Sequence, residues 1–138
     1  DLVRSRGLGD VYKRQYYTNH PLVPQNKVVA ILNLEQVGVG EMLGANYHYK
    51  YPELAELSEK ANDRYVHRRL FTSETHFLTR PRTDGAVFMK AGYPCIDLWA
   101  LGGGYYHHPK DNTQSINPDI LRAATEWLYW TTIFIADK

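Results

Sequence analysis

A run of seven mostly apolar residues, CIDLWAL at positions 95–101, leads directly into three glycines, Gly102, Gly103 and Gly104. A short apolar run that ends at turn-forming residues is typical of a strand buried in a sheet. The glycines let the backbone leave the strand end in conformations that other residues avoid. Open α/β sheets place their binding sites at the carboxyl ends of strands. The polar loop that follows, YYHHPKD at positions 105–111, is therefore the first candidate for a site.

His107 is the side chain of this loop that best suits a metal, because an imidazole nitrogen coordinates zinc at about 2.0–2.1 Å. The alternative is that His107 and His108 are two histidines of an ordinary loop. On the residues alone, both interpretations stay open.

The rest of the chain alternates between strand and helix patterns, which predicts an α/β fold with a mostly parallel sheet flanked by helices. Residues 27–34 (KVVAILNL) form a second apolar run typical of a covered strand, and Glu35 follows it. Residues 39–51, with glycines and aromatic residues, are expected to be a loop, with a short strand near residues 46–51 as an alternative. A helix is expected over residues 52–70, where Pro52 suits the first helical position.

Two further helices are predicted from their capping residues. Thr83 or Asp84 can cap a short helix that Gly92 ends. Asn117 suits the N-cap of the last helix, whose apolar residues recur at helical spacing.

Composition limits the class of protein. The chain has 138 residues, of which 43% are hydrophobic, and this is enough for one domain with its own core. No apolar run approaches the roughly 18 residues of a transmembrane segment. The net charge of +1 shows no basic surface of the kind that nucleic acids require.

The first fifteen residues stand apart from this pattern. Residues 1–15 (DLVRSRGLGDVYKRQ) have neither an apolar period nor the core of a signal peptide. Their end, DVYKRQ, resembles a translated sequencing adapter. We therefore expect residues 1–15 to be a non-native tail and residues 16–138 to be the folded unit, with a mobile basic arm as the alternative.

Three motifs occur in the order found in the zinc aminopeptidase family, which includes bacterial leucyl aminopeptidases, aminopeptidase S and glutamate carboxypeptidase. NLEQVG at positions 33–38 resembles the family's Asn-Leu-Asp-Met-x-Gly segment. RTDGAVFMKAGYP at positions 82–94 resembles Arg-Ser-Asp-His-x-x-Phe-x-x-x-Gly-x-Pro. YHHPKD at positions 106–111 resembles Tyr-His-Thr-Pro-x-Asp. The resemblance implies that residues 16–138 are the C-terminal part of a zinc peptidase catalytic domain, an incomplete three-layer sandwich.

The resemblance also implies roles for five residues. His107 matches a zinc ligand, and Glu35 stands where the family has an aspartate ligand. Tyr106 matches a tyrosine that some members use to stabilise the oxyanion. Thr83 and Asp84 are implied to border the substrate pocket. Zinc is the implied cofactor, with two ions in the complete domain.

Glu35 departs from the family pattern. A glutamate oxygen can bind zinc as an aspartate oxygen does, but the extra methylene must be absorbed by a shift of the backbone or the metal. The alternative is a glutamate that caps a helix or pairs with an arginine.

The implied function is a metallopeptidase that removes N-terminal residues from peptides with metal-activated water, in an exported (periplasmic or secreted) protein. The family takes its remaining ligands and its base from His-x-Asp and Glu-Glu segments, and this chain contains neither. We therefore expect the chain to depend on a missing N-terminal half of the domain and to be inactive alone. The alternatives are a non-catalytic peptidase-like binding domain and a one-zinc relative of the glutaminyl cyclases.

Overall fold

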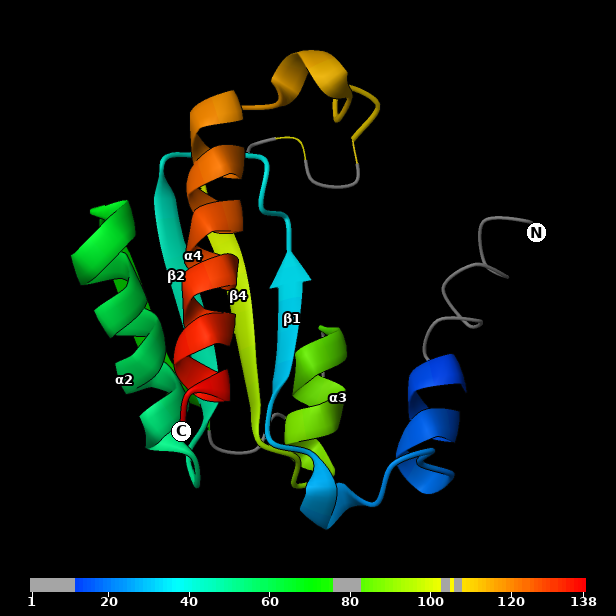
Figure 1. Ribbon diagram of the computed structural model, residues 1–138. Coiled ribbons are helices and arrows are strands. Elements are labelled where there is room, and N and C mark those ends of the chain that lie inside the picture. Colours follow the sequence, from blue (N-terminus) through cyan, green and yellow to red (C-terminus); the bar gives the residue numbers. More distant parts are fainter. Residues whose placement is uncertain (1–11, 76–82, 103–104, 106–107) are drawn as a thin grey trace.

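The computed structural model describes residues 12–75, 83–102, 105 and 108–138. Its centre is a four-stranded sheet in the order β1-β4-β2-β3, with helices on both faces (Figure 1). The β1–β4 and β2–β3 pairs are parallel, and the β2–β4 pair is antiparallel. This confirms the predicted α/β fold with a mostly parallel sheet.

The strands and helices are short, apart from the last helix. The strands are β1 (Ile31–Glu35), β2 (Met42–His48), β3 (Leu70–Thr75) and β4 (Cys95–Leu101). The α-helices are α2 (Pro52–Ala61), α3 (Asp84–Lys90) and α4 (Pro118–Ala136), and residues 12–19 are also helical. Single turns of other helix types cover Gln25–Lys27, Asn62–Val66 and Thr113–Ser115.

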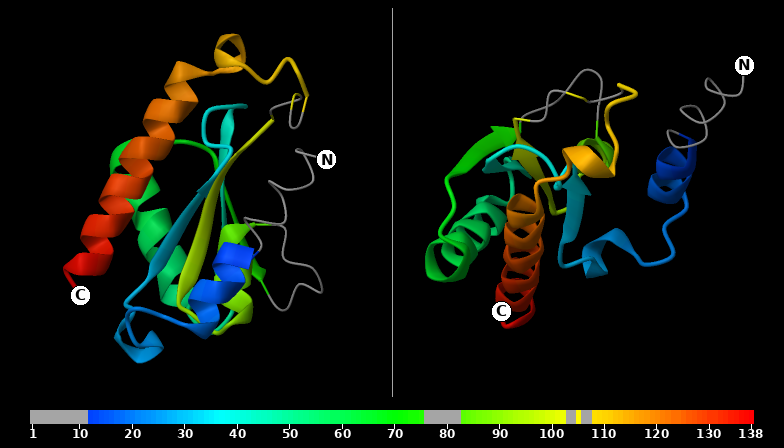
Figure 2. Two further views of the ribbon diagram at one scale, coloured as in Figure 1. Left: turned by 90° about the vertical axis from the view of Figure 1, so that its right-hand side faces the viewer. Right: turned by 90° about the horizontal axis from the view of Figure 1, so that it is seen from above.

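The helices form one layer on each side of the sheet. Helices α2 and α4 pack against each other and against one face, whereas α3 packs against β1 and β4 from the other face (Figure 2). The side chain of Trp127 in α4 is fully buried, and its Nε1–H donates a hydrogen bond to the Ser58 carbonyl of α2 at 2.8 Å. Among the described residues, no helix is both long enough and apolar enough to cross a membrane.

Strand β4 separates an apolar face from a polar one. Because side chains alternate along a strand, Ile96, Leu98 and Ala100 point together into the core beneath α2 and α4. Asp97 lies between them in the sequence and therefore points to the opposite face, toward α3. It is buried there, with only 2% of its surface exposed. The face of β4 toward α3 therefore carries a buried acidic side chain.

Two sequence predictions for the middle of the chain are wrong. Residues 39–51 are not mainly a loop, because β2 runs from Met42 to His48 between two other strands. Gly44, which suggested a loop, lies beneath the indole of Trp99, where an added Cβ would come within 2.5 Å of ring atoms. The glycine is there because the ring approaches the strand closely.

The helix expected over residues 52–70 is also shorter than predicted. Helix α2 ends at Ala61, a π-helical turn follows, and His67 adopts a left-handed conformation with φ of 54°. The buried side chain of Asn62 bonds both to the backbone N–H of Arg68 and to its carbonyl, at 3.1 and 2.9 Å. These contacts fix the exit from the helix, so that β3 can begin at Leu70.

The burial of His48 should make the stability of the fold depend on pH. His48 is the last residue of β2 and is 2% exposed, and its Nδ1 accepts the Lys50 N–H at 3.0 Å. Burial, and secondly the charge of Lys50, lower the pKa of His48 below 6.5. The unfolded chain therefore takes up a proton that the folded chain resists, and the free energy of unfolding should fall as the pH drops below about 6.5.

Urea unfolding between about pH 5 and pH 8 measures this effect, and the His48→Asn variant should lose that part of the pH dependence. His67→Asn is the matched control, because His67 is exposed and asparagine tolerates its left-handed conformation. The same pH dependence in wild type and His48→Asn would contradict the assignment.

Candidate functional site

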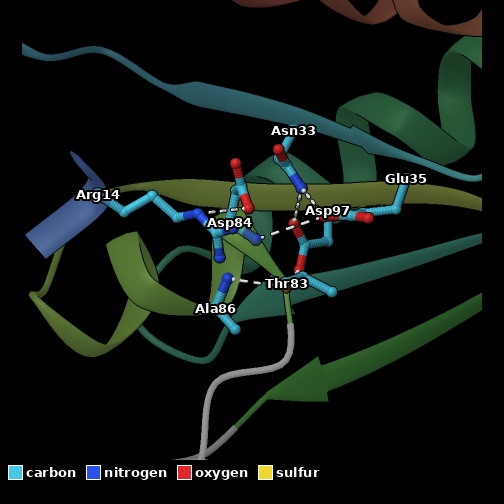
Figure 3. A network of polar contacts seen from close by, with 7 residues as sticks. All are labelled: Arg14, Asn33, Glu35, Thr83, Asp84, Ala86 and Asp97. Atoms are coloured by element: carbon cyan, nitrogen blue, oxygen red, sulfur yellow. Dashed lines mark hydrogen bonds and ion pairs between the residues drawn. The ribbon is translucent and has the colours of Figure 1, made fainter. Parts of the chain in front are cut away.

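The candidate site begins with the parallel pairing of β1 and β4. Asn33 lies opposite Asp97 in the register, and Glu35 lies opposite Trp99. Because alternate residues share a face, Asn33 and Glu35 point to the same side of β1. Figure 3 shows both side chains directed toward the amino end of α3 together with Asp97. The carboxyl ends of the parallel strands β1 and β4 thus lie near the start of α3.

Asp97 and Glu35 are linked by one amide group. The Nδ2 of Asn33 donates to Oδ1 of Asp97 at 2.8 Å and to Oε1 of Glu35 at 3.2 Å (Figure 3). The hydroxyl of Thr83 donates to the other Asp97 oxygen, Oδ2, at 2.5 Å. Hydrogen bonds to a charged acceptor are short and strong, so these two donors offset part of the cost of burying the Asp97 carboxylate.

The amino end of α3 connects to the same group of side chains. Of the two N-cap candidates in the sequence, Thr83 and Asp84, it is Thr83 that caps α3, and its Oγ1 accepts the Ala86 N–H at 3.0 Å. The backbone N–H of Asp84 donates to Oε1 of Glu35 at 3.4 Å. The Asp84 side chain pairs with Nε of Arg14 at 2.7 Å. Glu35 therefore shares one oxygen with two donors, from Asn33 and from the backbone of α3.

The electrostatics of the site are dominated by burial. Burial raises the pKa of Asp97, and the hydrogen bonds from Thr83 and Asn33 lower that pKa in part. The charges of Glu35 and Asp84 raise it further. In the described part of the chain, no three histidine, cysteine or acidic side chains are placed to hold a metal ion together.

A cavity of about 340 Å³ is lined by the residues that follow β1, beginning at Gln36. One wall is the turn of residues 36–40, and the other comes from the segment after β4, including Tyr105, Asp111 and Ile116. Gly102 and Tyr105, which line this cavity, precede Tyr106 and His107 in the sequence. Tyr106 and His107 themselves lie outside the described residues.

The structure brings together three of the residues singled out from the sequence, Glu35, Thr83 and Asp84. It adds two that the sequence analysis passed over, Asn33 and Asp97. Each is a polar residue inside an otherwise apolar strand, at a position where the side chain must be buried or paired. The acidic residue Asp97 inside an otherwise apolar run was the sequence feature that could have indicated this site.

Comparison with known proteins places the chain in a family. The sequence model of peptidase family M28 matches residues 13–131. Because this match spans most of the chain, the protein belongs to peptidase family M28. A search of curated protein sequences finds no match.

Solved structures show the same fold at low sequence identity. The Legionella pneumophila LapA aminopeptidase aligns over 90% of this chain and 34% of its own, with 15% identity and a TM-score of 0.70. BSAP, a zinc aminopeptidase from Bacillus subtilis, aligns over 86% and 31%, with 18% identity and a TM-score of 0.71. The γ-secretase component nicastrin aligns over 78% and 21%, with 15% identity and a TM-score of 0.55. The chain thus spans about a third of the length of the two aminopeptidases.

Replacing Gly85 should show how tightly α3 packs against Asp97. A Cβ at position 85 would lie 1.8 Å from Oδ1 of Asp97. Gly85→Ala should therefore lower the free energy of unfolding by about 1–3 kcal/mol through overpacking, despite a gain in helix propensity of about 1 kcal/mol. Gly38→Ala is the control, because its Cβ would only touch Ile116 at 3.9 Å. A Gly85→Ala variant as stable as wild type would contradict this packing.

The stability of Asp97→Asn relative to wild type should change with pH. Because the pKa of Asp97 is raised, the folded chain binds a proton at pH values where the unfolded chain has lost it. Wild-type stability should therefore fall relative to the variant as the pH rises above about 3.9 through the raised pKa. Denaturant unfolding of both proteins between about pH 3 and pH 8 measures the difference. A difference that is constant over this range would contradict the assignment.

Proposed function

We propose that this chain is the C-terminal part of the catalytic domain of a zinc-dependent aminopeptidase. The observation that carries the proposal is the position of Glu35, at the carboxyl end of β1, beside the strand whose continuation contains His107. Membership of family M28 and the fold of two aminopeptidases support it. The substrate would be a peptide with a free amino terminus.

The chemistry of Glu35 fits a zinc ligand. Its Oε1 accepts from Asn33 and from the Asp84 N–H, and Oε2 accepts no hydrogen bond from the described residues. A carboxylate oxygen is a usual zinc donor, and the imidazole of His107 would be the second donor. When bound, zinc polarises a substrate carbonyl and lowers the pKa of a water molecule to about 7.

The chain's own residues would then have separate tasks. Glu35 and His107 would hold zinc, and the phenol of Tyr106 would donate a hydrogen bond to the oxyanion. Thr83 and Asp84 would border the substrate pocket through the position of α3. The cavity between residues 36–40 and Tyr105 would accept part of the peptide.

We also propose that this chain does not hydrolyse peptides by itself. Two protein donors do not complete a zinc site, which uses three or four. The two aminopeptidases extend over about three times the length of chain that aligns here. The remaining ligands and the general base would come from the N-terminal half of the domain.

A non-catalytic peptidase-like binding domain is the second candidate. Glu35 in place of the family's aspartate favours it, because the longer side chain changes the metal geometry. Nicastrin, which has a similar fold, is a component of γ-secretase.

Zinc calorimetry distinguishes the two candidates. In the aminopeptidase proposal, His107→Ala and Glu35→Gln should each weaken zinc binding by more than about tenfold, since even residues that only support ligands cost about 10–100-fold. His108→Ala is the matched control from the same loop, because His108 is exposed and, among the described residues, the hydrogen bond of its ring is to the nearby Lys110 N–H. Equal binding by all variants would contradict the assignment of Glu35 and His107 as zinc ligands in this chain, on which the aminopeptidase proposal rests. Aminopeptidase activity of the zinc-loaded chain would refute the proposed inactivity.

A further inference from the structure

We propose that Asn33, anchored by Asp97, is a positioning residue that holds one oxygen of Glu35 and leaves the other free for the metal. This inference rests on the proposed function, because it takes Glu35 as a metal ligand. It assigns a task to the partly buried Asn33 and the buried Asp97, which the metal site itself does not use. It also explains how the chain tolerates a glutamate where the family has an aspartate.

The bond pattern of Asn33 is that of a bridge between two carboxylates. Its Nδ2 carries two hydrogens, and two acceptors lie within reach, Oδ1 of Asp97 at 2.8 Å and Oε1 of Glu35 at 3.2 Å. The amide is planar, so fixing one hydrogen fixes the direction of the other. The shorter bond, to Asp97, therefore determines where Glu35 is held.

Asp97 is itself immobile for three reasons. It belongs to the central strand β4 and is 2% exposed. Its second oxygen accepts the Thr83 hydroxyl at 2.5 Å. Its Oδ1 also occupies the space beside Gly85 where a Cβ would lie, which leaves it no room to rotate toward α3. The positions of α3 and β4 therefore determine, through Asp97, where the side-chain amide of Asn33 lies.

These hydrogen bonds restrict the conformations of the Glu35 side chain. A glutamate has one more rotatable bond than an aspartate, and a metal must otherwise order that bond when it binds. The Asn33 amide and the Asp84 N–H both bind Oε1, which selects the conformations in which Oε2 is unengaged. Groups that orient a metal ligand in this way strengthen metal binding without touching the metal.

The competing explanation is that the network only caps α3. Thr83 indeed caps the helix through the Ala86 N–H. A purely structural network would, however, lower stability when it is broken and leave the metal affinity of the folded chain unchanged. The two explanations therefore differ in metal affinity, measured on variants that are folded.

The test is a zinc titration of the chain by competition with a chromophoric chelator, with folding of each variant checked by circular dichroism and thermal unfolding. Asn33→Ala should weaken zinc binding by about tenfold. Asp97→Val, which removes both acceptors, should weaken it to a similar extent. Asp97→Asn should stay within about twofold of wild type, because its carbonyl oxygen can still accept from Asn33 and its amide can donate to Thr83.

A double-mutant cycle with Glu35→Gln separates failure of this inference from failure of the proposed function. If Glu35→Gln weakens zinc binding and Asn33→Ala does not, Glu35 is a ligand and the positioning role is overturned. If Glu35→Gln has no effect, the ligand assignment itself fails. The inference expects Asn33→Ala to cause no further loss once Glu35 is replaced.

A second measurement tests, without any metal, whether Asn33 bridges Asp97 and Glu35. The two side-chain amide protons of Asn33 should give separate NMR signals, one sensitive to Asp97→Val and the other to Glu35→Gln. Asn46→Ala is the control, because Asn46 faces Asp97 across the β2–β4 pair and contributes no hydrogen bond to this network. Asn33 signals that are unchanged by both substitutions would overturn the inference, whatever the zinc titration gives.

Discussion

The parallel pairing of β1 with β4 is the interaction on which the rest of the site depends. Its register places Asn33 opposite Asp97 and carries Glu35 to the end of the pair. Alternation along β4 then assigns one face to the apolar core and the other to α3. A shift of one residue would exchange the two faces, moving Asp97 among the apolar side chains under α4. The buried core on one side therefore fixes the polar arrangement on the other.

The buried carboxylate of Asp97 is costly unless it is paired with hydrogen-bond donors. Thr83 and Asn33 supply these donors from two different elements, so the position of α3 and the position of β1 are coupled through one side chain. The absence of a side chain at Gly85 lets the helix approach closely enough for this to happen. The stability of the fold and the geometry of the candidate site thus depend on the same few contacts. A substitution that alters these contacts is therefore expected to change both.

The sequence analysis singled out some residues of the candidate site and not others. Glu35, Thr83 and Asp84 were found because they occur in ordered motifs and beside turn or cap residues. Asn33 belongs to the same motif as Glu35, and Asp97 belongs to the apolar run of β4, but neither received a role, because each looked like an interruption of a strand pattern. Their significance lies in a contact between residues 64 positions apart, which no local pattern contains. The part of the site expected at Tyr106 and His107 rests on the motif and its place after β4.

The sequence by itself determined the elements whose ends are set locally. Strand β4 has the predicted bounds, and α3 and α4 begin after the predicted caps, Thr83 and Asn117, because a capping side chain bonds to its own helix. Only the tertiary structure decided that residues 42–48 form a strand and that the helix from Pro52 stops at Ala61. The reason is that β2 gains its hydrogen bonds from two distant strands and its burial from α2, contributions that do not exist until the chain has folded.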